Sequence, residues 1–129
     1  MRLLLDTSCW LWMTAAPERL STATRDLLLD EGTELYLSAA SAWEMAIKHG
    51  LGRLQLPAPL EHYLPSRLAA FRTTPLAVEH AHAFRVAALP AHHRDPFDRL
   101  LIAQAQIEGL AILTSDRLFD RYDVQIVPA

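Results

Sequence analysis

Four carboxylic acids occupy positions from which their side chains could act together. Asp6 and Asp116 each follow a short apolar run that is typical of a buried strand. Glu44 and Asp98 lie in segments with a helical pattern, close to where those helices begin. In α/β sheets, functional groups gather beyond the carboxyl ends of the parallel strands. We therefore expect the four acids to converge on one edge of a sheet.

Converging carboxylates repel one another unless a cation lies among them. Hard oxygen ligands, in a set without histidine or cysteine, favour Mg²⁺ or Mn²⁺. Such a site suits phosphodiester hydrolysis, in which the metal polarises the phosphate and lowers the pKa of an attacking water. The pattern of acids thus predicts metal-dependent hydrolysis of a phosphate ester.

Two acids near the start of one expected helix also have structural interpretations. Asp95 precedes Pro96, which is a favourable arrangement for the N-cap of a helix. Asp98 lies where a capping-box acid would lie, and this role and a role in the site carry equal weight. The pair His92-His93, just before them, is interpreted first as a loop feature and only second as a contact to metal or RNA.

The remaining acids differ in how readily structure alone explains them. Glu44 and Lys48 are four residues apart, which predicts a surface ion pair; we favour an interpretation in which Lys48 lines the site. Asp116 could cap the turn that follows it. Asp6 is the hardest to explain by structure, because no helical pattern directly follows it.

The elements that must position these acids alternate along the chain. Short apolar runs separated by helical patterns predict an α/β fold with a mostly parallel central sheet. Ser21 is expected to cap one helix, and Gly50 and Gly109 to close two others. Trp10 and its neighbours are interpreted as an apolar cluster without helical periodicity. The expected strands are 2–5, 34–37, 110–113 and 124–127, and the expected helices are 22–30, 43–48, 60–71, 74–89 and 97–108.

Composition narrows the possibilities further. With 129 residues, the chain is expected to form one domain, residues 1–129. Its single cysteine, Cys9, permits no internal disulfide, as is usual in a reducing cytoplasm. We find no membrane-span pattern and no signal-peptide core, so we expect a cytoplasmic protein. The net charge of −3 argues against binding nucleic acid by bulk charge, but not against a nuclease whose acids reach phosphate through metal ions.

Four short motifs occur in a fixed order along the sequence. They are residues 3–7 (LLLDT), 37–44 (LSAASAWE), 93–105 (HRDPFDRLLIAQA) and 113–116 (LTSD). In this order and spacing, the chain resembles the PIN-domain ribonucleases, and most closely the VapC-type toxins of bacterial toxin–antitoxin pairs. The resemblance extends from Met1 to about Val127.

The resemblance implies a three-layer α/β/α fold and an acid quartet that binds Mg²⁺ or Mn²⁺ and cleaves RNA. By motif, the quartet is Asp6, Glu44, Asp98 and Asp116. Thr114 matches the threonine that precedes the last acid, and is expected to orient a ligand or water. The lesser candidates beside the quartet are Asp95, Thr114, Lys48 and Asp120.

The resemblance also implies partners. Toxins of this type pair with a small antitoxin that covers the active-site groove, commonly form homodimers, and often cut structured RNAs. Trp10 and Trp12 lie in a short apolar segment, and at least one of them is expected to be buried by a partner chain. Burial of both in the chain's own core is the competing interpretation, at even weight.

Two non-catalytic alternatives compete with the nuclease. A receiver-like signalling module would need adjacent acids after its first strand and a lysine after a later strand. Here Asp6 is followed by Thr7, and the only lysine, Lys48, lies in a helical pattern. An inactive PIN-like binding module would be expected to lack one of the four acids, yet all four are present.

Overall fold

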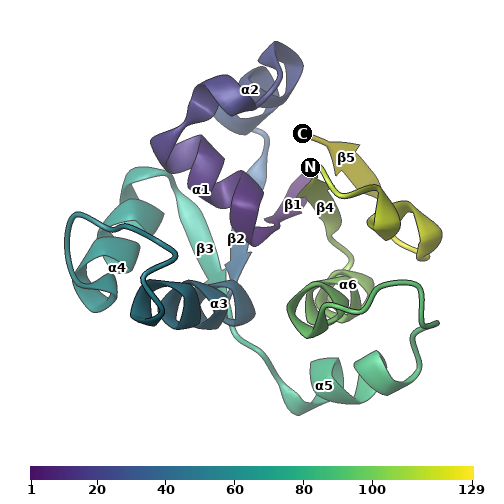
Figure 1. Ribbon diagram of the computed structural model, residues 1–129. Helices are drawn as coiled ribbons and strands as arrows, with labels where there is room; N and C mark the ends of the chain where they lie inside the picture. The colour runs from purple at the N-terminus through teal and green to yellow at the C-terminus, as the bar shows by residue number, and fades with distance from the viewer.

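The computed structural model describes residues 1–129. Five parallel strands form one sheet in the order β3-β2-β1-β4-β5, and helices cover both of its faces (Figure 1). The expected α/β class and parallel sheet are confirmed. The strands are β1 Arg2–Leu5, β2 Glu34–Ser38, β3 Thr73–Leu76, β4 Ala111–Thr114 and β5 Ile126–Pro128. The helices are α1 Thr7–Ala15, α2 Thr22–Leu29, α3 Ala39–Gly50, α4 Leu60–Ala70, α5 His80–Ala87 and α6 Pro96–Glu108, with 3₁₀ turns η1 Pro17–Arg19 and η2 Arg117–Arg121.

The strand β1 lies at the centre of the sheet and contributes to two cores. Its alternating side chains point to opposite faces, as the period of a strand requires. Leu3 and Leu5 pack in a core with side chains of α1, α3 and α4, whereas Leu4 packs in a second core with side chains of α6 and η2. This is the three-layer arrangement expected from the resemblance.

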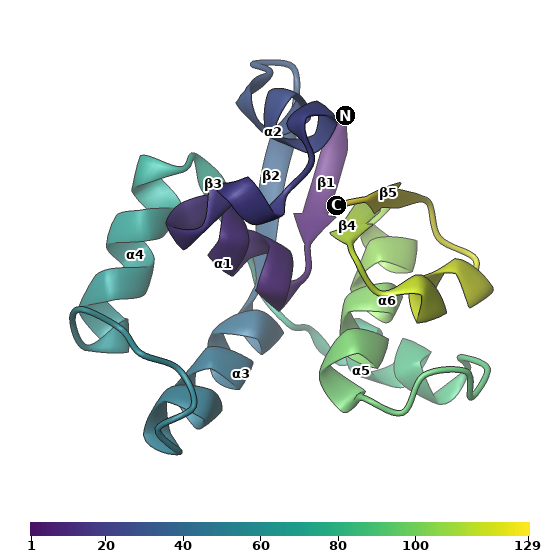
Figure 2. The ribbon, with the colours of Figure 1, turned by 45° about the horizontal axis from the view of Figure 1, so that its top comes forward.

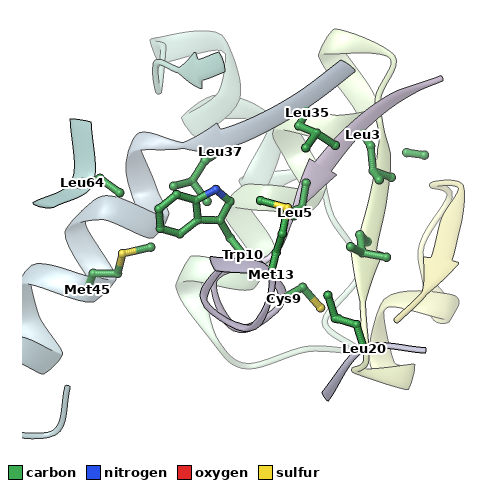
Figure 3. Close-up of a cluster of buried hydrophobic side chains, with 12 residues drawn as sticks. Leu3, Leu5, Cys9, Trp10, Met13, Leu20, Leu35, Leu37, Met45 and Leu64 are labelled. Carbon is green, nitrogen blue, oxygen red and sulfur yellow. The ribbon is translucent and has the colours of Figure 1, made fainter. Parts of the chain in front are cut away.

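The first helix, α1, was not expected from the sequence. Its residues are apolar on nearly every side, so no helical stripe marks it. Trp10 is fully buried in the first core beside Leu37 and Met45 (Figure 3), and its Nε1 donates to Thr73 Oγ1 at 3.3 Å. The helix also gives Asp6 the structural role that was hardest to see in the sequence, because Asp6 is the N-cap of α1.

A second correction concerns residues 74–89, which were expected to be one helix. The segment begins as strand β3, and the helix α5 starts only at His80. Pro75 is tolerated because β3 is an edge strand, where a missing N–H costs no hydrogen bond on the open side. The last strand also begins two residues later than expected, at Ile126.

Three predicted helix ends are confirmed, whereas α3 begins at Ala39, four residues earlier than expected. Ser21 caps α2, Asp95 caps α6, and Gly109 ends α6 with a φ of 67°, in the left-handed region that glycine adopts without strain. Trp12 is half-buried, with the Arg19 guanidinium 4.6 Å from its ring centre. No helix is long and apolar enough to cross a membrane.

Candidate active site

The carboxyl ends of β1 and β4 bring the first and last acids of the quartet together. Leu5 pairs with Leu113, so Asp6 and Thr114 emerge side by side. The Thr114 hydroxyl donates to Asp6 Oδ2 at 2.6 Å and accepts from the Asp116 backbone N–H at 3.0 Å. A single hydroxyl therefore joins the two acids.

Asp6 and Asp116 each also cap the helical turn that follows their strand. Asp6 Oδ1 accepts from the Cys9 N–H at 2.7 Å, and Asp116 Oδ1 accepts from the Leu118 N–H at 2.9 Å. Burial, followed by the charge of Asp6, raises the pKa of the Cys9 thiol, so this cysteine is not a nucleophile. The two carboxylates are thus held by main-chain groups at the edge of the sheet.

Glu44 reaches the same edge from α3. Its Oε1 lies 2.7 Å from the Thr7 hydroxyl, which lies 2.9 Å from Ser41 Oγ. Since a carboxylate only accepts, Thr7 donates to Glu44 and Ser41 donates to Thr7. Lys48 Nζ donates to the other oxygen, Oε2, at 2.7 Å. The Glu44 side chain is 12% exposed and that of Lys48 48%, so the carboxylate is sheltered while the ammonium group is open to solvent.

Asp98 enters the site from the first turn of α6. Figure 2 shows α3 and α6 on either side of the end of β1, where the chain turns into α1. The pKa of Asp98 is raised to about 7, mainly by burial and then by the charge of Asp95; His93 opposes the shift, and Asp6 and Glu44 add to it. Asp98 is therefore electrostatically coupled to the acids on the neighbouring elements.

His93 connects Asp98 to Asp116. Its Nε2 lies 2.8 Å from Asp116 Oδ2 and 3.2 Å from Asp98 Oδ2. The ring is buried and packs edge-on against Phe119. In the sequence this histidine had appeared mainly as a loop residue; the DPFD motif that follows it was the only signal of its place beside the acids.

The two other candidate acids, Asp95 and Asp120, differ in their relation to the quartet. Asp95 Oδ1 accepts from the Phe97 N–H at 2.8 Å as the cap of α6, and its charge acts on Asp98. Asp120 is exposed on η2 and makes no hydrogen bond or ion pair with the quartet.

The donor set suits a divalent cation. The quartet offers four carboxylates. Burial is the main cause of the raised pKa of Asp98, and the charges of neighbouring acids add a repulsion that a cation would offset. His93, Asp98 and Asp116 offer ligand atoms that all lie within 4.8 Å of one another. Carboxylate oxygens of this kind are the ligands that Mg²⁺ and Mn²⁺ prefer.

An aromatic pair borders the acids. Trp43, the residue before Glu44, is 62% exposed, and its ring meets that of Phe97 edge-on at 5.1 Å. A concavity of about 620 Å³ lies elsewhere, lined by residues such as Leu28, Tyr36 and Phe71, and none of the quartet lines it. The chemistry of the acids, rather than the size of a hollow, identifies the candidate site.

Comparison with known proteins gives matches over nearly the whole chain. Residues 3–125 match the PIN domain family. Ribonuclease VapC22 of Mycobacterium tuberculosis is 33% identical over 115 residues, which are 88% of this chain and 86% of that protein. Ribonuclease VapC16 of the same organism is 48% identical over 59 residues, 46% of this chain and 42% of that protein.

Solved structures share the fold. VapBC2 from Rickettsia felis, bound to a DNA fragment from its promoter, aligns with a TM-score of 0.74 at 15% identity, over 99% of this chain and 98% of that chain. A toxin–antitoxin complex from Klebsiella pneumoniae aligns with a TM-score of 0.60 at 15% identity, over 97% of this chain and 95% of that chain. At these identities the likeness extends to the fold alone.

Proposed function

Because the chain belongs to the PIN-domain family, in the branch of the VapC ribonucleases, we propose that it is a metal-dependent endoribonuclease and the toxin of a toxin–antitoxin pair. One observation carries the proposal. Three acids of the quartet are linked at one sheet edge, with Thr114 joining Asp6 to Asp116 and His93 joining Asp116 to Asp98, and the charge of Glu44 acts on Asp98. A chain that had kept the fold and lost the activity would have no need of these linked acids.

The quartet Asp6, Glu44, Asp98 and Asp116 would hold Mg²⁺ or Mn²⁺. When bound, such an ion polarises the scissile phosphate and lowers the pKa of an attacking water. The chain's own residues supply orientation and charge. The Thr114 hydroxyl fixes one oxygen of Asp6, the Thr7 hydroxyl fixes one oxygen of Glu44, and the main chain fixes one oxygen each of Asp6 and Asp116.

An incubation with structured RNA tests the proposal. The purified protein should cut the RNA internally with Mg²⁺ or Mn²⁺ and should be inactive with EDTA. Asp120→Asn is a matched control, since it removes an exposed acid outside the quartet and should cut normally. Absence of cleavage with either ion would favour a non-catalytic binding module.

The proposed partners follow from the branch of the family. We expect a small antitoxin that covers the quartet, a homodimer, and action on RNA in the cytoplasm. Trp10 belongs to the chain's own core, so Trp12 and the exposed Trp43 are the tryptophans that a partner could cover. Light scattering should give the mass of a dimer at micromolar concentration, and a monomer would contradict this expectation.

A further inference from the structure

The loop between α5 and α6 is fixed by contacts that do not involve the quartet. The Tyr122 hydroxyl accepts from the backbone N–H groups of His92 and His93, at 3.1 and 2.7 Å. The Arg99 guanidinium donates to the Pro90 carbonyl at 2.9 Å and the Val86 carbonyl at 3.1 Å. The backbone of the loop is therefore placed by α6 and by the segment after η2.

The ring of His93 is fixed in one tautomer by the start of α6. Its Nδ1 lies 3.1 Å from the Asp95 backbone nitrogen, whose N–H can only donate. Nδ1 must then carry a lone pair, and the hydrogen of the neutral ring must lie on Nε2. That hydrogen points to Asp116 Oδ2 at 2.8 Å, with Asp98 Oδ2 at 3.2 Å from the same nitrogen.

A metal ligand needs the opposite arrangement. To coordinate an ion through Nε2, His93 would have to move its hydrogen to Nδ1, where it would face the Asp95 N–H at 3.1 Å. Two donors directed at each other leave an N–H without an acceptor beside the buried ring, which is unfavourable. The geometry therefore opposes coordination by His93, although its nitrogen lies among atoms that could hold an ion.

We propose that His93 is a positioning residue: as an Nε2–H donor it holds Asp98 and Asp116 together beside the ion and does not coordinate it. This rests on the proposed function, because the ion is the one that the quartet would bind. The two acids come from different elements, α6 and the turn after β4, and no other side chain contacts both.

NMR spectroscopy of the imidazole ring tests the tautomer of His93 directly. Long-range ¹H–¹⁵N spectra of histidine-labelled protein report which nitrogen carries hydrogen, and the His93 signal is the one lost in His93→Gln. We expect the Nε2–H form in EDTA and the same form after Mg²⁺ or Zn²⁺ is added. A shift of the hydrogen to Nδ1, or loss of the Nε2 hydrogen when either ion is added, would overturn the proposal. These spectra need no RNA, so they test the donor role of His93 independently of ribonuclease activity.

Two variants distinguish hydrogen-bond donation by His93 from metal coordination by His93 and from the packing of its side chain. Glutamine can keep an N–H at the position of Nε2, whereas leucine keeps only the bulk. Titration calorimetry with Mg²⁺, without RNA, should show affinity weakened about tenfold or more in His93→Leu, the scale of lost support for metal ligands, and close to wild type in His93→Gln. Equal losses in both variants would contradict the donor role. If His93→Leu does not fold, as judged by circular dichroism, the glutamine variant and the spectra still decide.

Discussion

Asp6 and Asp116 differ from Glu44 and Asp98 in what holds their carboxylates. The first two follow strands, and each gives one oxygen to a backbone N–H of the helical turn that it caps. The second two project from helices and are contacted only by side chains. Those contacts are Thr7 and Lys48 for Glu44, and His93 for Asp98.

The difference separates what the fold provides from what single residues provide. Main-chain donors persist through most substitutions, so the strand pair, Asp6 and Asp116, is fixed whenever the sheet forms. The helix pair, Glu44 and Asp98, depends on neighbours that one mutation can remove. We therefore expect changes in the strand pair to abolish chemistry outright, and changes around the helix pair to tune charge, stability and metal affinity.

The largest effect should come from the strand pair. Asp6→Asn keeps a good N-cap for α1 but removes a charge from the quartet. Cleavage at saturating Mg²⁺ should fall about a hundredfold or more, while the metal-free protein melts at the same temperature or higher. Rates of RNA cleavage and a melting curve measure both. Equal cleavage by variant and wild type would remove Asp6 from the site.

The next effect concerns Asp98 and pH. Its pKa is raised to about 7 in the folded protein and has its ordinary value, near 3.8, in the unfolded chain. The folded state therefore binds the proton more tightly, and the stability of the metal-free protein should fall as pH rises between these values and level off above about 7. Urea unfolding in EDTA at a series of pH values between about 4 and 7 measures this dependence of stability on pH. Asp98→Asn should flatten the dependence, and an unchanged slope in that variant would assign it to another group.

A smaller effect separates Asp95 from Asp98. Asp95 caps α6 through the Phe97 N–H, so Asp95→Ala should cost about 1 kcal/mol of unfolding free energy with a modest loss of activity. Asp98→Ala should instead cause a large loss of activity with little loss of unfolding free energy. Urea unfolding and cleavage rates measured on both variants decide. If the two behave alike in both assays, the division between cap and site is wrong.

The smallest effect concerns Lys48. Its ammonium group neutralises Glu44 and repels an incoming cation, but the side chain is 48% exposed. An exposed helical pair is worth about 0.3–0.5 kcal/mol, so Lys48→Met should tighten Mg²⁺ binding by no more than about twofold. Calorimetric titration against wild type measures the change. Identical affinities would show that Lys48 does not line the site.

The sequence predicted the features that depend on local chemistry and on the general geometry of parallel sheets. Asp95-Pro96 and Gly109 marked both ends of α6, because caps and left-handed glycines act locally. The expectation that acids after parallel strands would meet agrees with the contacts of Asp6 and Asp116 through Thr114.

What the sequence did not predict depends on tertiary contacts. The helix α1 has apolar residues on nearly every side, and its partly exposed side chains include Leu11 and Trp12, so its sequence shows no stripe. The strand β3 contains Pro75, which only an edge position permits. His93 acquires its place beside two acids through Tyr122 and Arg99, and no spacing in the sequence shows that these residues meet.

The central position of β1 has a consequence for the chain as it is made. The bond between Thr114 and Asp6 spans 108 residues, and β1 cannot gain its neighbour β4 until the last part of the polypeptide has been synthesised. A ribosome-bound chain that has completed α6 but stops short of β4 contains Asp6, Glu44 and Asp98 but neither Thr114 nor Asp116. Such incomplete products of translation therefore lack the last acid of the quartet and the hydroxyl that joins it to Asp6. The cell that makes the protein therefore meets the assembled quartet only after the chain is nearly finished.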